Sequence, residues 1–147
     1  MKMDPINITI LGHLRDGKKS IKKIANEMKL SENTVRIRIN RMLRDGVLEF
    51  SGLVDPTLIP GHMVVLVGVK LSTMELVKRG EDFKELRGVV SATVVTGRYD
   101  LILTVLLNED FGLLEFYTEE VSRIKDVQSV ETFVIYKSYN LKVPYVL

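Results

Sequence analysis

The sequence predicts an α+β protein whose first third is helical and whose remainder alternates strands with helices. Two periodicities carry this prediction. Apolar residues recur at helical spacing over residues 6–48, whereas strand-like apolar runs alternate with helical patterns from residue 63 onward. Residues 51–61 lie between these parts and hold two prolines and two glycines, which is typical of a linker. We therefore expect one domain at residues 1–50, a linker at 51–61 and a second domain at 62–147.

Composition limits the classes of protein to consider. Of the 147 residues, 46% are hydrophobic and 27% are charged, so a disordered chain is not expected. The chain lacks cysteine, which excludes disulfides and thiolate zinc sites, and no apolar run approaches the ~18 residues that cross a bilayer. We expect a cytoplasmic protein without membrane partners. Because each half buries only a modest core, we also expect an oligomer.

Positive charge is concentrated at the N-terminal end of the chain. Residues 1–50 carry 11 Lys or Arg against 6 Asp or Glu, whereas the rest carries 10 against 13. A local basic segment favours attraction to phosphates, although charge runs also solvate ordinary helix faces.

The first two helices are indicated by their caps and apolar stripes. Asp4 is the expected N-cap of the first helix, and Pro5 occupies its first turn, where proline is tolerated. The second helix is expected over residues 20–28 with Ser20 as its cap. The two apolar stripes are Ile6, Ile10, Leu11 and Leu14, then Ile21, Ile24, Ala25 and Met28.

A third helix is predicted over residues 31–43, after a turn of only Lys29 and Leu30. Ser31 supplies the cap, and an apolar stripe of Val35, Ile39 and Met42 must face the core. A short turn before a capped helix is typical of a helix-turn-helix. Off the stripe lie side chains of the types that read DNA, because Arg pairs with guanine, Asn pairs with adenine, and Ser and Thr bind phosphates. The residues off the stripe are Asn33, Thr34, Arg36, Ile37, Asn40, Arg41 and Arg44, of which all but Ile37 are polar.

A strand is expected at residues 47–50, directly after Gly46, and completes a winged helix-turn-helix. The alternative from the residues alone is a plain three-helix bundle whose arginines only keep it soluble.

The second domain follows the order βαββαβ, which is the ferredoxin-like arrangement. Strands are expected at residues 63–71, 89–96, 101–107 and 127–137. The first helix should open with a capping box at residues 72–75 and run to about Leu86; the second should be capped by Asn108 or Asp110. The apolar stripe of this second helix is expected to be Leu114, Tyr117, Val121 and Ile124.

An internal match supports the repeat within this domain. Residues 86–92 align with residues 124–130 at an offset of 38, and both segments join a helix end to a strand start. The strands are apolar enough for both faces of the sheet to be covered, one by the two helices and the other by a second subunit.

Three short segments give the chain a family likeness. The first, at the first helix and the turn after it, is Ile10-Leu11 with Leu14 and Asp16-Gly17-Lys18. The second, in the helix-turn-helix, consists of Ile24-Ala25, Leu30-Ser31, Val35, Arg38-Ile39, Met42 and Gly46-Val47-Leu48. The third, in the second domain, is Thr96-Gly97-Arg98-Tyr99-Asp100-Leu101. At these spacings the sequence resembles the Lrp/AsnC family of regulators over nearly its whole length. Three positions depart from the family pattern: Asn7 replaces an acidic residue, Lys19 sits near the customary arginine, and Ile37 interrupts a polar face.

The resemblance implies a transcriptional regulator that binds double-stranded DNA as a homodimer, which often assembles further. It also implies an amino-acid-like effector bound between dimers. Together with the helix pattern, it predicts the DNA-binding residues Lys19, Ser31, Asn33, Thr34, Arg36, Arg38, Asn40 and Arg41. The predicted effector-binding residues are Gly97, Arg98, Tyr99, Asp100 and Thr132. In this interpretation the Asp100 carboxylate accepts a hydrogen bond from the α-ammonium group of the effector. The alternative is that Gly97 and Asp100 only form the hairpin turn between two strands.

Two other functions are compatible with parts of the sequence. A siroheme decarboxylase-like enzyme subunit shares the two-domain plan, but it is expected to carry histidine in the middle strands, and residues 93–100 have none. A ligand-sensing assembly protein without DNA binding would not need the basic N-terminal half. His13 and His62 are too isolated for a metal site or a catalytic pair, so we expect no catalytic residues, metal or cofactor.

Overall fold

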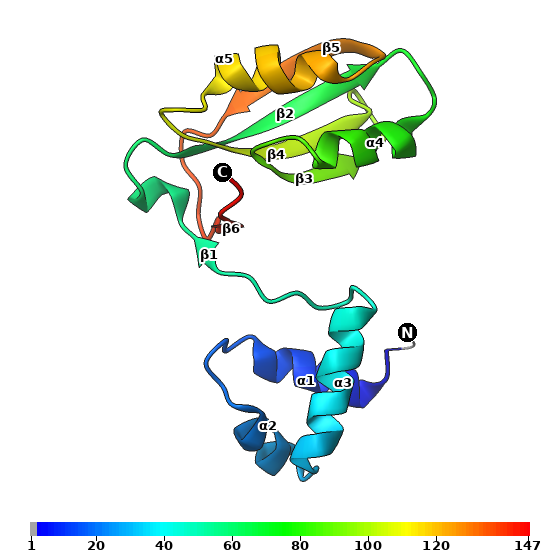
Figure 1. Cartoon of the computed structure of the whole chain (residues 1–147), viewed down its shortest axis with the longest axis vertical. Coiled ribbons are helices and arrows are strands. Elements are labelled where there is room, and N and C mark those ends of the chain that lie inside the picture. The colour runs from blue at the N-terminus through cyan, green and yellow to red at the C-terminus, as the bar shows by residue number, and fades with distance from the viewer. Residues whose placement is uncertain (1–2) are drawn as a thin grey trace. The chain divides into compact units, whose positions relative to one another are not determined.

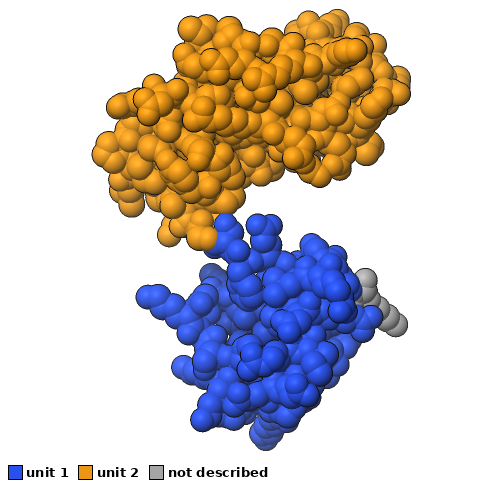
Figure 2. All heavy atoms as spheres, in the orientation of Figure 1, with its two compact units in different colours: residues 1–51 blue, residues 52–147 orange. Residues whose placement is uncertain are grey.

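The computed structural model describes residues 3–147 and divides the chain into two compact units, residues 1–51 and 52–147 (Figure 2).

Within its described residues, 3–51, unit 1 holds three helices, α1 (Pro5–Leu14), α2 (Ile21–Met28) and α3 (Glu32–Arg44). The three predicted N-caps are confirmed. The side chains of Asp4, Ser20 and Ser31 each accept a hydrogen bond from the backbone amide three residues later. Each cap satisfies an amide that the helix itself leaves without a partner.

The predicted apolar stripes converge in the core of unit 1. Ile10, Ile24, Val35 and Met42 are fully buried there, and Ile39 is nearly so. The turn from α2 to α3 is tight, because Lys29 adopts a left-handed conformation with φ 54° and the Leu30 amide bonds back to the Ala25 carbonyl at 2.9 Å. These contacts fix α3 against α1 and α2, as a helix-turn-helix requires.

The strand expected at residues 47–50 is wrong. The Val47 and Leu48 amides donate to the Met42 carbonyl and so close the end of α3 instead. An isolated strand has no ladder partner in unit 1, which explains its absence. The first strand is β1 (Leu53–Val54), which pairs with β6 (Val143–Pro144) near the other end of the chain. The segment expected to be a linker thus contributes β1 and the 3₁₀ turn η1 (Pro56–Leu58) to unit 2.

Unit 2 is built on four antiparallel strands in the order β3-β4-β2-β5, which confirms the βαββαβ prediction. Strands β2 and β4 have the predicted bounds, whereas β3 and β5 end two and three residues early. The strands are β2 (Met63–Leu71), β3 (Val89–Val94), β4 (Leu101–Leu107) and β5 (Val127–Val134). The helices lie on one side of this sheet and β6 on the other (Figure 1).

The expected starts of both unit 2 helices are wrong. Helix α4 (Leu76–Lys84) begins after the expected capping box, because the Thr73 hydroxyl accepts from the Glu75 amide in a preceding turn. Asn108 likewise closes a turn by accepting from the amides of residues 110 and 111, so α5 (Leu113–Glu115) starts only after its N-cap Gly112.

A wide π turn, η2 (Phe116–Glu120), and a tight turn, η3 (Val121–Arg123), continue α5. The change of helix type shifts the side-chain phase, so Leu114 is 69% exposed and Phe116 is buried in its place. The core of unit 2 therefore joins Phe83 and Phe116 to alternate residues of β2 and β4.

The internal repeat is visible in the backbone. Gly88 and Asp126, which align at the offset of 38, both have positive φ, at 81° and 66°. At Gly88 a Cβ would lie 2.7 Å from the Leu106 carbonyl oxygen, so only glycine fits.

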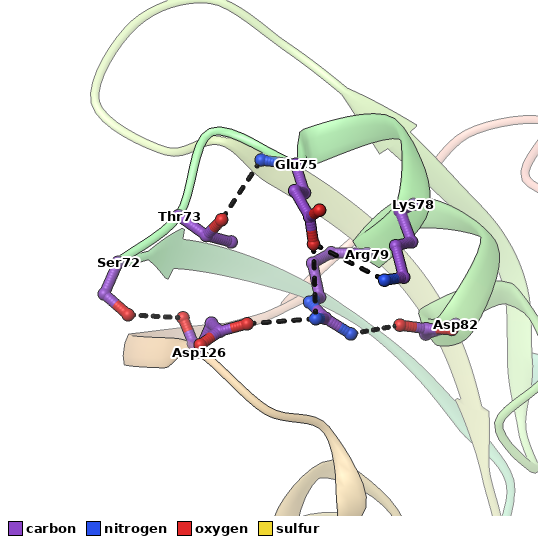
Figure 3. A network of polar contacts seen from close by, with 7 residues as sticks. All are labelled: Ser72, Thr73, Glu75, Lys78, Arg79, Asp82 and Asp126. Carbon is purple, nitrogen blue, oxygen red and sulfur yellow. Dashed lines mark hydrogen bonds and ion pairs between the residues drawn. The ribbon is translucent and has the colours of Figure 1, made fainter.

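Asp126 belongs to a polar network that includes Ser72, Arg79 and Asp82 (Figure 3). Its carboxylate lies 3.0 Å from Arg79, and its carbonyl accepts from the Ser72 amide at 2.9 Å. The hydrogen bond to Asp82 and the charge of Asp126 raise the pKa of Arg79. This network ties α4 to the turn before β5.

Candidate nucleic-acid interface and effector turn

The face of α3 opposite the core carries four of the predicted DNA-binding residues. Asn33, Arg36, Asn40 and Arg41 are all exposed, while the buried stripe of the same helix packs into unit 1. Within residues 3–147, the side chains of Asn33, Arg36 and Asn40 make no hydrogen bond or ion pair. Their donors and acceptors are therefore available to a ligand.

The C-terminal half of this face is cationic and hollowed. Arg41 and Arg44 are 59% and 76% exposed, and each approaches Asp45 only loosely, at 3.8 Å. A surface hollow of about 500 Å³ is lined by Arg41, Arg44 and Asp45 together with Ile37 and Asn40. Arg44 was not among the predicted contacts, although its place on the exposed face follows from helical spacing.

Ser31 and Thr34 serve the start of α3. The Ser31 hydroxyl accepts from the Thr34 amide at 3.1 Å, and the two hydroxyls lie 2.8 Å apart. Both side chains are thus held at the N-terminal end of the helix, where the backbone amides and the helix dipole favour an anion such as a phosphate.

Arg38 is held at the side of α3 rather than on its exposed face. Its Nη1 donates to Asp4 at 2.7 Å and to Asn7 at 2.9 Å, and the side chain is 27% exposed. This donation, together with the Asn7 amide bond, lowers the pKa of Asp4. Asn7 is buried, at 4% exposure. Arg38 therefore joins α3 to the start of α1, and its contact with DNA stays a prediction.

Lys19 is also engaged within unit 1. Its ammonium lies 2.5 Å from Glu27 and 2.8 Å from His13, and only 14% of the side chain is exposed. The hydrogen bond from Lys19 lowers the pKa of Glu27. The surrounding hollow of about 380 Å³ brings two cations that were not predicted as contacts, Arg15 and Lys23, beside Lys19.

In unit 2, the predicted effector turn joins β3 to β4. Asp100 is only 17% exposed and uses both carboxylate oxygens, because it accepts from the Leu71 amide at 2.8 Å and from the Lys70 ammonium at 2.9 Å. These two donors, the amide first, lower the pKa of Asp100. The expected ammonium partner is thus present, but it belongs to Lys70 of the same chain. Gly97 has φ 130° and open space around it.

Tyr99 lies flat against the sheet beside this turn. A Cβ at Gly68 would lie 2.7 Å from the Tyr99 ring, so the glycine makes room for the ring. The Tyr99 hydroxyl donates to Glu131, which raises the pKa of Tyr99, and Arg98 lies 3.3 Å from the same carboxylate. Lys70 and Glu131 were missed from the sequence because their partners are distant along the chain. A glycine within an apolar strand was the available signal for Gly68.

Thr132 is not brought to this turn. It pairs with Val67 across the β2-β5 ladder, whereas its neighbour Glu131 pairs with Gly68. Successive strand residues point to opposite faces. Thr132 accordingly faces the helices, where its hydroxyl lies 2.5 Å from that of Tyr117.

Residues 3–147 contain no group of three His, Asp or Glu side chains placed to hold a metal ion. No helix among those same residues is long and apolar enough to cross a membrane.

Comparison with known proteins matches both units. Residues 3–49 match the family described as winged helix-turn-helix DNA-binding, and residues 64–143 match the Lrp/AsnC ligand binding domain. An uncharacterized HTH-type transcriptional regulator of Pyrococcus abyssi is 28% identical over 92% of this chain and 87% of its own. An HTH-type transcriptional regulator of Methanocaldococcus jannaschii is 24% identical over 93% and 94%.

Solved structures share the fold at lower identity. AsnC from Escherichia coli superposes with a TM-score of 0.72 at 19% identity, over 96% of this chain and 97% of that one. A Neisseria meningitidis transcriptional regulator, described as a complex with L-Met, gives 0.71 at 16% identity, over 99% and 96%. With a ligand-binding domain of this type over more than half its length and a helix-turn-helix before it, the chain belongs to the Lrp/AsnC family of transcriptional regulators.

Proposed function

We propose that the exposed face of α3 reads double-stranded DNA in a sequence-specific manner. The observation that carries this proposal is the division of α3 into a buried apolar stripe and an opposite face whose amide and guanidinium groups are available to base edges and phosphates. The hydroxyls of Ser31 and Thr34 add phosphate ligands at the start of the helix.

The test is a titration of a labelled promoter fragment with the full chain over a range of salt concentrations. Arg41→Ala should weaken binding by about 1–3 kcal/mol if Arg41 reads a base, or reduce the salt slope by about 1 if it binds a phosphate. Arg123→Ala is the control, because Arg123 is similarly exposed, at 66%, but lies in unit 2. Equal affinity and salt slope for both variants and the wild type would contradict the proposal.

A second part of the proposal is that a small amino-acid-like effector modulates DNA binding or assembly through the turn at residues 97–100. The support is the match of unit 2 to a ligand-binding domain and the L-Met complex of a structural relative. In this chain an effector ammonium would have to compete with Lys70 for Asp100. An effector carboxylate would likewise have to compete with Glu131 for Arg98, which is 79% exposed and lies 3.3 Å from that carboxylate.

Thermal unfolding in the presence of each common amino acid tests the effector. At about 100 times Kd a ligand stabilises its site by roughly 2.7 kcal/mol. Lys70→Met should strengthen the effect of an active amino acid, because the competing ammonium is gone, while Asp100→Ala should abolish it. A shift that survives Asp100→Ala would place the effector elsewhere.

We further propose that the chain works as a homodimer and as assemblies of dimers. The helix-free face of the sheet carries Leu66, Ile102 and Phe133, and Phe133 is 40% exposed, so a second copy has an apolar surface to cover. A two-fold dimer reads half-sites about 34 Å apart, or a multiple of that distance. Sedimentation of the full chain measures the assembly; a monomer at micromolar concentration would contradict it.

A further inference from the structure

Ile37 is an apolar side chain in the middle of the exposed face of α3. At about 100° per helical residue, Ile37 lies roughly 140–160° from Val35, Ile39 and Met42, which point into the core. It is 58% exposed. All α3 residues are described, and Ile37 is the large hydrophobic side chain that this helix leaves exposed.

Folding gives no reason for isoleucine at this position. Ile37 does not belong to the core of unit 1 or to the partly buried residues packed against it. A β-branched residue is a weaker helix former than Arg, Lys, Gln or Glu, which would also solvate the face. Isoleucine is therefore unfavourable at this position in the isolated chain, and a binding partner that covers the side chain would explain its presence.

The neighbours of Ile37 define what that partner must offer. Asn33, Asn40 and Arg41 lie about 40–60° from Ile37 around the helix, and Asn40 and Arg41 line the same hollow. The partner must therefore present hydrogen-bonding groups and one apolar group side by side. In the major groove, thymine has this chemistry, because its O4 acceptor lies next to its 5-methyl group.

We propose that Ile37 is a specificity-determining residue that packs against the 5-methyl group of a thymine in the major groove. This inference rests on the proposed DNA-binding function and adds to it the identity of one base in each half-site.

The experiment starts with selection of bound duplexes from an unmethylated random library by the full wild-type chain. Each thymine of the selected site is then replaced singly by deoxyuridine, which removes only the 5-methyl group. We expect one thymine in each half-site whose replacement weakens binding roughly fourfold, the effect of about one buried methyl group. In Ile37→Ala the same replacement should have no effect.

The matched control is Ile8→Ala. Ile8 is 57% exposed and lies on α1 of the same unit, so the substitution removes the same atoms from a comparably exposed site. This variant should discriminate thymine from deoxyuridine as the wild type does. Far-UV ellipticity of both variants checks that the helices are retained.

The outcomes separate the two proposals. Failure to enrich any duplex would contradict DNA reading itself. Enrichment without a sensitive thymine, or equal discrimination by Ile37→Ala and the wild type, would overturn the role of Ile37 alone. Sensitivity only to 5-methylcytosine, in a methylated library, would overturn the assignment to thymine.

Discussion

Replacing Arg38 with leucine separates a structural role from a DNA contact. The substitution removes both donations from Nη1 and leaves the Asn7 side-chain oxygen without its Arg38 donor in a site that is 4% exposed. An unsatisfied buried acceptor costs about 1–3 kcal/mol. The half-exposed carboxylate of Asp4 adds less, because water can replace its partner. At about 4–8 °C per kcal/mol for a small domain, the melting midpoint of unit 1 should fall by at least about 4 °C.

The assay can follow the two units separately. All five tyrosines lie in unit 2, between residues 99 and 145, so tyrosine fluorescence reports on unit 2, whereas far-UV ellipticity is dominated by helices such as α1, α2 and α3. Arg38→Leu should lower the ellipticity midpoint and leave the fluorescence midpoint unchanged. Arg41→Leu is the control, because a substitution at this exposed position should change stability by less than about 0.5 kcal/mol.

The result that refutes this reasoning is an unchanged ellipticity midpoint for Arg38→Leu combined with a loss of DNA affinity as large as that of Arg41→Leu. Arg38 would then act through DNA and not through Asp4 and Asn7.

Four further predictions test the remaining contacts. Gly68→Ala should displace the Tyr99 ring and destabilise unit 2 by about 1–3 kcal/mol, seen as a lower tyrosine-fluorescence midpoint. Gly88→Ala should destabilise unit 2 more than Asp126→Ala in urea unfolding, because only the Gly88 Cβ meets a backbone oxygen. Lys70→Met should raise the pKa of Asp100 only part of the way to 3.8, because the Leu71 amide remains; carboxyl NMR titration measures this. The lowered pKa of Asp4 stabilises the folded state above its unfolded value of 3.8, so wild-type unit 1 should lose stability as pH falls below about 4, and Arg38→Leu should lose less.

Local signals in the sequence predicted the elements that depend on neighbouring residues. Asp4, Ser20 and Ser31 cap helices through amides three residues away, so the pattern alone was sufficient. The strand order followed from the alternation of apolar runs, and the repeat placed two left-handed residues at equivalent positions.

Features that depend on distant partners could not be predicted in this way. The expected strand at residues 47–50 found no partner, whereas Leu53 and Val54 pair with residues 143–144. Arg38 has the right residue type and spacing for DNA, but Asp4 and Asn7 reach it only in the folded unit. Asp100 was expected to bind an external ammonium, and Lys70 supplies one from an adjacent strand.

Selection of bound genomic fragments by the full chain tests the central claim, that the exposed face of α3 reads DNA, most directly. The wild type should enrich fragments that share an inverted repeat with half-sites about 10 base pairs, or a multiple, apart. A variant with Arg36, Asn40 and Arg41 all changed to Ala should lose this enrichment while keeping its ellipticity and its sedimentation. No enrichment by the wild type, or the same repeat enriched by the variant, would contradict the claim.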